Sequence, residues 1–408
     1  MLFGLRSSSI LIACVFLLAN GWQACSLVAQ QESGPKVAEG TSPKAIAKKR
    51  FAAVDELLES AVEDEKVIGH SALIFHQGKE IYYGDFGDRN ARKSLPLQRD
   101  TIFRIYSMSK PITSVATMQL VEQGKIDLDA PISKYIPALG KVKVYDDGEL
   151  VDANREMTPR DLLRHTSGLT YGFFGNTEVD QQYRKKGIMI TDTNIEGTVE
   201  KLSTVPLLHQ PGERFHYSVS TDVLGRLVEV ASGERFDDYL KKNIFDPLKM
   251  NDTFFTVPKD KQERFSQIYQ GRDGNLKPKN AFASYRFLNE NDLDSGGGGL
   301  CSTIDDYLTF CKMLLNEGKL GDAQIIKPDT LKQMFTNQLD TKRRSSFEFG
   351  LGFRCFPEGD FGWGGAAGTR FWVNPEKDLA ILYMVQINPY GNRKWGNRVR
   401  SLVYETLD

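Results

Sequence analysis

The chain has 408 residues, 40% of them hydrophobic and 26% charged, which is typical of globular proteins and unlike disordered chains. Its 52 Lys and Arg against 53 Asp and Glu leave a net charge of -1, so no basic excess favours a nucleic-acid partner. Five Cys exclude a disulfide scaffold, and no apolar stretch approaches the roughly 20 residues of a membrane span.

The first 29 residues have the pattern of an export signal. Arg6 is their only charged residue, and Ile10–Ala19 is an uninterrupted apolar run. Cleavage after Gly21 or Ser26 fits this pattern, but we favour cleavage after Ala29. We therefore expect a signal peptide over 1–29 and an exported product, periplasmic or secreted.

A lipid anchor is the alternative fate of this segment. It would use Cys25, but Trp22 stands where a small aliphatic residue is usual in lipoprotein signals. The residues after the signal, 30–43, are polar with Gly and Pro, and we interpret them as a linker. Three Cys remain beyond it, at 301, 311 and 355, and we expect them to be free thiols.

Hydrophobic periodicity and turn residues predict the elements of the mature chain. A helix over Pro43–Glu65 precedes a β-hairpin with strands Ser71–Phe75 and Glu80–Phe86. The predicted helices that follow are Ser107–Glu122, Thr158–Arg164, Asp222–Ala231 and Thr303–Asn316. From residue 349 the period changes to two, which predicts strands Phe349–Phe356, Gly368–Val373 and Leu379–Val385 before a final helix, Lys394–Leu407.

This order predicts an α+β fold. One antiparallel sheet, flanked by helices, would be assembled from both ends of the chain, with an all-helical region between them. Within a catalytic domain over 44–408, the sheet subdomain would comprise about 44–106 and 296–408, and the helical subdomain about 107–295.

Several kinds of chemistry lack a sequence signal. The five His form no zinc-binding pattern, and no Cys-x-x-Cys is present, so we expect no metal site. No Gly-x-Ser-x-Gly elbow supports an α/β-hydrolase. The four-glycine run 296–299 is not followed by Lys-Ser/Thr, so we interpret it as a tight turn rather than a phosphate loop.

The strongest chemical signal is Ser107-Met108-Ser109-Lys110-Pro111 at the start of a predicted helix. Residues i and i+3 share one helical face, and the positive end of the helix dipole favours negative charge developing at Ser107. A serine hydroxyl needs a nearby base, and Lys110 can serve only as a neutral amine, which burial or a neighbouring cation would favour. A capping serine beside a solvated lysine is the alternative.

Two further segments strengthen the catalytic hypothesis. Tyr217, in Tyr217-Ser218-Val219, lies just before a predicted helix, where its hydroxyl could move protons beside Ser107 and Lys110. The run Trp363-Gly364-Gly365 lies before a strand, and its small residues would let a ligand or another backbone approach closely. A packed tyrosine and a simple tight turn are the alternatives.

Taken together, Ser-x-x-Lys, Tyr-Ser-x and Trp-Gly-Gly in this order resemble the serine β-lactamase and penicillin-binding-protein superfamily, most of all its class C-like family VIII carboxylesterases. The stretches 163–169, 210–213 and 298–303 agree, so the resemblance covers roughly residues 45–405. It implies a β-lactamase/transpeptidase-like fold, a site between the sheet and helical parts, acyl transfer through a serine ester and no cofactor.

The resemblance also implies roles for individual residues. Ser107 matches the nucleophile, Lys110 its base and Tyr217 the hydroxyl that moves protons. The backbone N–H groups of Ser107 and Ala366 match the oxyanion hole, which stabilises the developing negative charge. The triplet Trp363-Gly364-Gly365 takes the place of the usual Lys/His-Thr/Ser-Gly.

Two departures from the family pattern concern the substrate. Val219 stands where β-lactamases of this type carry an Asn, and Trp363 replaces a cation, so we expect Val219 and Trp363–Gly365 to line a site for neutral, apolar esters. Arg370, just downstream, could restore a positive charge.

The resulting hypothesis is an exported serine carboxylesterase or transesterase acting on small acyl esters through a Ser107 acyl-enzyme. The alternatives are a β-lactamase or D-Ala-D-Ala carboxypeptidase, and an inactive binding protein. The expected partner is a small ester or lactam substrate, with no nucleic acid and no membrane span.

Overall fold

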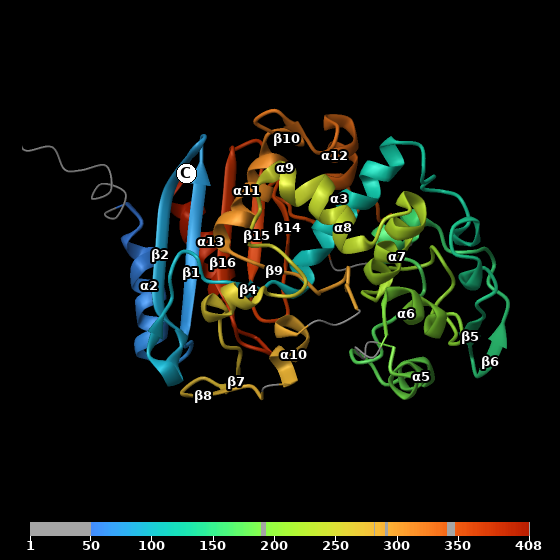
Figure 1. The fold of residues 1–408 in the computed structure, drawn as a ribbon, viewed down its shortest axis with the longest axis horizontal. Helices are drawn as coiled ribbons and strands as arrows, with labels where there is room; N and C mark the ends of the chain where they lie inside the picture. Colours follow the sequence, from blue (N-terminus) through green and yellow to red (C-terminus); the bar gives the residue numbers. More distant parts are fainter. Residues whose placement is uncertain (1–49, 189–192, 281, 290–292, 341–346, 408) are drawn as a thin grey trace, which may run out of the picture. The chain divides into compact units, whose positions relative to one another are not determined.

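The computed structural model describes residues 50–407 except 189–192, 281, 290–292 and 341–346 (Figure 1). The predicted signal peptide, the predicted linker and the first residues of the predicted helix Pro43–Glu65 lie outside the described residues. Within them, no helix is both long and apolar enough to cross a membrane.

One eight-stranded sheet is the largest element of the fold. Its strand order is β12-β13-β14-β15-β16-β1-β2-β3, and every neighbouring pair is antiparallel. The strands are β1 (Gly69–His76), β2 (Lys79–Asn90), β3 (Leu95–Pro96), β12 (Glu348–Phe349), β13 (Arg354–Cys355), β14 (Phe361–Gly364), β15 (Arg370–Asn374) and β16 (Leu379–Val385). Figure 1 shows β1 and β2, in blue, beside β16, in red, so the sheet joins both ends of the described chain.

The two faces of the sheet lie in two different cores because successive strand side chains point in opposite directions. In β16 every residue is buried: Leu382 and its alternate neighbours face the larger core, whereas Ile381 and its alternate neighbours face the smaller one. The register pairs Leu73 with Leu382 and Ile74 with Ile381, so β1 alternates in the same way. A strand covered on both faces is expected to be apolar throughout, and β16 is.

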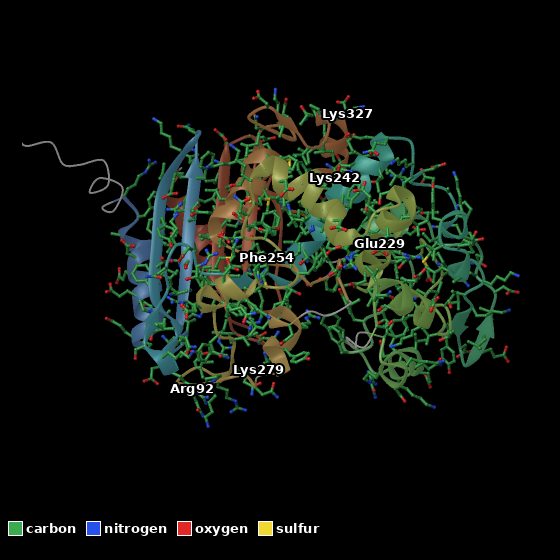
Figure 2. All side chains as sticks on the ribbon, in the orientation of Figure 1. Arg92, Glu229, Lys242, Phe254, Lys279 and Lys327 are labelled. Carbon is green, nitrogen blue, oxygen red and sulfur yellow. The ribbon has the colours of Figure 1, made fainter. Side chains whose placement is uncertain are left out.

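Helices cover both faces. Helices α2 (Ala52–Glu63) and α13 (Trp395–Leu407) supply side chains to the smaller core. Side chains of α3 (Ser109–Glu122), α7 (Ser220–Ser232) and α11 (Ile304–Leu315) fill the larger core together with those of β1 and β16. Figure 2 draws the described side chains on the ribbon, with Glu229 of α7 labelled. The other helices are α4 (Pro159–Leu163), α5 (Glu178–Lys186), α6 (Ile195–Leu202), α8 (Phe236–Leu240), α9 (Asp246–Leu248), α10 (Phe282–Leu288) and α12 (Pro328–Phe335).

Four short two-stranded sheets complete the described strands. They are β4 (Phe103–Arg104) with β9 (Cys301–Ser302), β5 (Val144–Asp146) with β6 (Glu149–Val151), β7 (Tyr269–Arg272) with β8 (Asn275–Pro278), and β10 (Lys319–Leu320) with β11 (Ala323–Gln324). The pair β4–β9 matters for function because β4 ends three residues before Ser107.

The predicted fold class is confirmed: a large antiparallel sheet from both ends of the chain is flanked by helices. The predicted all-helical region also contains the hairpins β5–β6 and β7–β8, which the sequence interpretation missed. The prediction of one continuous strand over Phe349–Phe356 was wrong, because the structure has two short strands there, β12 and β13. Gly352, at φ 95°, lies between β12 and β13 and turns the chain there, because this left-handed region suits glycine.

Candidate active site

Ser107 lies in a single 3₁₀ turn, Tyr106–Met108, that leads into α3. The preceding residue, Tyr106, has φ 43°, an uncommon backbone conformation for a residue with a side chain of this size. The backbone here is held from both sides: Ile105 N–H donates to Leu300 O, and a Cβ on Gly365 would lie 2.4 Å from Ile105 O. Ser107 itself is half-buried, so its hydroxyl is presented near the surface rather than sealed in the core.

Lys110 lies one helical turn beyond Ser107, and only 1% of it is exposed. Its Nζ is 3.4 Å from Ser107 Oγ, 2.7 Å from Tyr171 Oη and 2.5 Å from Gly297 O. A carbonyl oxygen can only accept, so one N–H of Lys110 must point at Gly297. When the amine is neutral and its second N–H donates to Tyr171, its lone pair is directed at the Ser107 hydroxyl.

Tyr171 is a member of this cluster that the sequence interpretation missed. It is buried, and its hydroxyl accepts from Lys110. Burial, followed by the nearby Tyr217 and Asp222, raises the pKa of Tyr171 well above its usual value. The Tyr171 hydroxyl therefore stays protonated and orients the Lys110 amine rather than competing with it for a proton.

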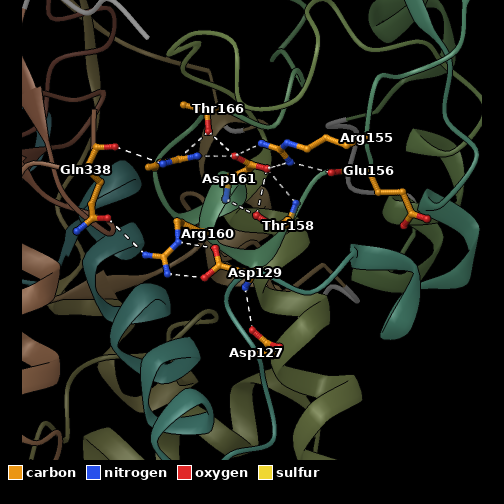
Figure 3. Close-up of polar contacts among 10 residues, drawn as sticks. Asp127, Asp129, Arg155, Glu156, Thr158, Arg160, Asp161, Thr166 and Gln338 are labelled. Carbon is orange, nitrogen blue, oxygen red and sulfur yellow. Dashed lines mark hydrogen bonds and ion pairs between the residues drawn. The ribbon is translucent and has the colours of Figure 1, made fainter. Parts of the chain in front are cut away.

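A buried carboxylate, Asp161, anchors the loop that carries Tyr171 (Figure 3). Its two oxygens accept hydrogen bonds from the guanidinium groups of Arg155 and Arg164, from the Thr166 hydroxyl and from Thr158 N–H. Burial opposes the charge on Asp161, yet the Arg155 and Arg164 hydrogen bonds hold its pKa below the usual value. The ionised carboxylate thus fixes the chain at Thr166, at the start of the loop.

Tyr217, three residues before α7, lies beside Lys110. Lys110 Nζ is 4.7 Å from the centroid of the half-buried Tyr217 ring, and the Trp363 indole N–H donates to Tyr217 Oη at 3.4 Å. The ring of His165 packs 4.8 Å from that of Tyr217. Burial, followed by the charges of Lys110 and His216, lowers the pKa of His165 well below its usual value, so this imidazole is neutral.

The four-glycine run is more than the turn that the sequence predicts, because Gly297 O accepts from Lys110. The buried carboxylate of Asp222 holds this segment: its Oδ1 accepts from Gly297 N–H at 3.1 Å and from Ser295 Oγ at 2.5 Å. A Cβ at Gly297 would lie 2.5 Å from Asp222 Oδ2, so only glycine lets the chain approach so closely. Asp222 and Gly297 therefore position the lysine.

The segment 363–369 forms a strand end and a tight turn beside Ser107. Gly365 N–H donates to Thr369 O, and Gly368 N–H to Gly365 O, which leaves Ala366 exposed at the tip. Among the described residues, the Ala366 N–H donates to no backbone acceptor. Trp363, Gly364 and Gly365 are each partly exposed, so this edge can contact a ligand.

Val219 is the predicted site residue that the structure does not bring to the surface. It is 0% exposed and belongs to the larger core, at the start of α7. We therefore correct the expectation that its side chain lines the substrate site. The Val219 side chain therefore supplies neither a contact with the substrate nor the side-chain amide that Asn would carry at this position.

In the part of the chain that the structure describes, no three His, Cys, Asp or Glu side chains are grouped to hold a metal ion. Cys301 and Cys311 are free and buried, and Cys355 is free and partly exposed.

Comparison with known proteins agrees with the fold. The Beta-lactamase family profile matches residues 54–404. An uncharacterized protein of Mycobacterium tuberculosis is 33% identical over 349 residues, covering 79% of this chain and 86% of that protein. Esterase EstB of Burkholderia gladioli is 29% identical over 82% of this chain and 89% of its own length. The solved structure of EstCE1, described as a hydrolase with promiscuous acyltransferase activity, superposes with a TM-score of 0.78 at 25% identity over 88% of this chain and 100% of that one.

Proposed function

Since the chain belongs to the Beta-lactamase family, with hydrolase and acyltransferase relatives, we propose that it is a serine carboxylesterase that also transfers acyl groups to alcohols. The observation that carries this proposal is the arrangement of three oxygen atoms around Lys110 Nζ. Two of them, Gly297 O and Tyr171 Oη, engage its N–H bonds and leave its lone pair for the third, Ser107 Oγ.

The proposed reaction starts at Ser107. Its hydroxyl oxygen attacks the carbonyl carbon of the ester while its proton passes to the neutral amine of Lys110. The negative charge that develops on the carbonyl oxygen is stabilised by the N–H groups of Ser107 and Ala366, which act as the oxyanion hole. The tetrahedral intermediate then collapses, the bond to the alcohol oxygen breaks, and a proton returns to the departing alcohol.

Tyr217 is the group proposed to deliver that proton, with Lys110 resupplying it. The Trp363 indole N–H, directed at Tyr217 Oη, holds the phenol in place and would stabilise negative charge on its oxygen. Water, or an alcohol in the transfer reaction, then attacks the acyl-enzyme by the same steps in reverse. The edge formed by Trp363, Gly364 and Gly365 is proposed to contact the substrate.

Purified protein should hydrolyse p-nitrophenyl acetate or butyrate, and Ser107→Ala should lower kcat by at least about 10³-fold. The matched control is Ser114→Ala on the same helix, because Ser114 Oγ is buried and hydrogen-bonds to no described residue. Intact-mass measurement during turnover should show one added acyl group on the parent protein and none on Ser107→Ala. Full activity of Ser107→Ala would end the proposal, and turnover of nitrocefin comparable with that of the esters would favour a β-lactamase.

We also propose export, supported by the apolar run within 1–29. Intact-mass analysis of the periplasmic or secreted product should show a chain that starts near residue 30.

A further inference from the structure

Phe173 and Phe174 are the two most exposed large hydrophobic side chains of the described residues, at 60% and 63%. They lie in the loop that runs from Tyr171 to α5. Single exposed apolar side chains are ordinary on protein surfaces, but two adjacent phenylalanines beside a candidate active site are not. No step of the proposed acyl transfer uses them.

The two rings continue the aromatic wall of the site. The ring centroids of Phe173 and Phe174 lie 4.6 Å apart, and that of Phe174 lies 5.9 Å from that of Tyr217. The Tyr217 ring in turn lies 5.5 Å from that of Trp363. Rings at these separations are in contact, so one row of aromatic side chains leads from the end of β14, past Tyr217, to the exposed pair.

The loop that carries the pair is closed by one carboxylate, Asp180 of α5. Before the pair, the Thr170 hydroxyl donates to Asp180 Oδ1 at 2.8 Å. After the pair, the N–H and hydroxyl of Thr177 donate to Asp180 Oδ2 at 3.1 and 2.8 Å. A Cβ on Gly175 would lie 2.4 Å from the same Oδ2, so the chain passes too close to Asp180 for a larger residue.

Arg184, one turn further along α5, holds the middle of the loop. Its Nη1 donates to Gly172 O and, at 3.1 Å, to Gly175 O, which are the carbonyl groups directly before Phe173 and directly after Phe174. A hydrogen-bonded backbone therefore presents both rings to the surface. An apolar surface that is ordered in advance binds a ligand with a smaller loss of entropy than a loop that must first be ordered.

The proposed role of Tyr217 decides which half of the ester would reach the pair. A phenol that delivers a proton to the departing alcohol must lie beside the alcohol oxygen. Among the described residues, no ring contact joins Phe174 to Trp363, so the two lie on different sides of the Tyr217 ring. Trp363 leads to Ala366 and the proposed oxyanion hole, which leaves the side of Phe174 for the substituent on the alcohol oxygen.

We infer that Phe173 and Phe174 form the binding site for an aromatic group on the alcohol half of the ester. This inference rests on the proposed esterase function and names its substrate class more closely: esters of alcohols that carry an aromatic ring. Such a ring can stack against Phe174 and cover apolar surface that the free protein exposes to water.

The test compares esters that differ in one half only. Ethyl butyrate and benzyl butyrate differ in the alcohol, whereas methyl butyrate and methyl 4-phenylbutyrate differ in the acyl group. Phe174→Ala and Phe173→Ala should each lower the benzyl-to-ethyl ratio of kcat/KM about 3- to 20-fold, through KM more than kcat. The ratio for the acyl pair should not change. Phe174→Leu, which keeps an apolar side chain but not the flat face, should recover part of the benzyl-to-ethyl ratio.

Two controls separate the pair from exposed apolar surface and from charge. Leu150→Ala removes a side chain that is 59% exposed on β6 and should leave both ratios unchanged. Arg184→Gln, which loses the hydrogen bonds to the loop, should lower the benzyl-to-ethyl ratio but not kcat for ethyl butyrate. Lys185→Gln removes the same charge from the next, exposed residue of α5 and should have no effect.

Three results would overturn the inference: unchanged benzyl-to-ethyl ratios in both phenylalanine variants, equal losses on the ethyl and benzyl esters, or a larger change in the acyl pair than in the alcohol pair. An Arg184→Gln enzyme with the ratio of its parent would contradict the role of the braced loop.

Calorimetric binding of uncleaved esters separates this inference from the proposed function. Ser107→Ala should bind benzyl butyrate more tightly than ethyl butyrate, and adding Phe174→Ala should abolish that preference. If the parent hydrolyses no ester but this preference is present and is lost as stated, the aromatic site stands and the esterase proposal fails. If Ser107→Ala binds the two esters equally while the parent hydrolyses both with equal kcat/KM, the aromatic site is refuted and the esterase proposal stands.

Discussion

Replacing Tyr171 with Phe tests whether the lysine is oriented as the geometry indicates. The Phe ring can keep the packing of a residue that is only 8% exposed, but Lys110 Nζ loses the acceptor at 2.7 Å. Because Lys110 is 1% exposed, water cannot readily replace that hydroxyl. A hydrogen bond involving a charged or buried amine contributes roughly 1.5–3 kcal/mol, so kcat/KM should fall about 10- to 100-fold.

The assay is initial-rate hydrolysis of p-nitrophenyl butyrate across pH, with thermal unfolding measured in parallel. Tyr183→Phe is the control, since Tyr183, 1% exposed, is also buried in the same core but lies outside the Lys110 cluster. A Tyr171→Phe enzyme as active as its parent would refute the reasoning. A loss matched by Tyr183→Phe would point to packing instead.

Two further predictions concern buried groups. Asp222→Asn preserves the shape of the side chain but weakens the hydrogen bond that its Oδ1 accepts from Gly297 N–H, so kcat should fall about tenfold. Ser107 should still react with a fluorophosphonate probe. An unchanged kcat would show that Asp222 does not position Lys110. For stability, burial lowers the pKa of His70 to about 4 despite its hydrogen bond to Leu58 O. Because the unfolded chain takes up this proton below pH 6.5 and the folded chain does not, the free energy of unfolding should fall by roughly 3 kcal/mol between pH 6.5 and 4. His70→Gln should flatten that part of a urea-unfolding series, and an unchanged slope would contradict the assignment.

The sequence predicted those features that depend on local pattern. The period-two run Leu379–Val385 is a strand with the same limits in the structure, because both its faces are buried apolar surfaces. The spacing of Ser107 and Lys110 was sufficient to place them together, since one helical turn separates them. The strand β14 was missed because Trp363 and its glycines carry no alternation of apolar and polar residues.

Features that depend on contacts between distant segments could not be predicted in this way. Tyr171 reaches Lys110 on a loop whose start Asp161 fixes at Thr166, and nothing in the local sequence indicates where that loop goes. The Tyr171 residue does follow the stretch 163–169 that carries the family resemblance, which is the signal that could have drawn attention to it. Val219 was assigned to the site from its place in a motif, whereas the packing of α7 turns it into the core.

Pairing β1 with β16 has a consequence for how the protein is made. The ribosome releases β1 and β2 early, and these can form their hairpin at once, but β16 (Leu379–Val385) is synthesised only after all the elements from β3 to β15. Until then the nascent chain exposes one unpaired edge of an apolar strand, the kind of surface that promotes aggregation. Products of premature termination before Leu379 keep that edge permanently, so they are expected to accumulate as insoluble material rather than as smaller folded units.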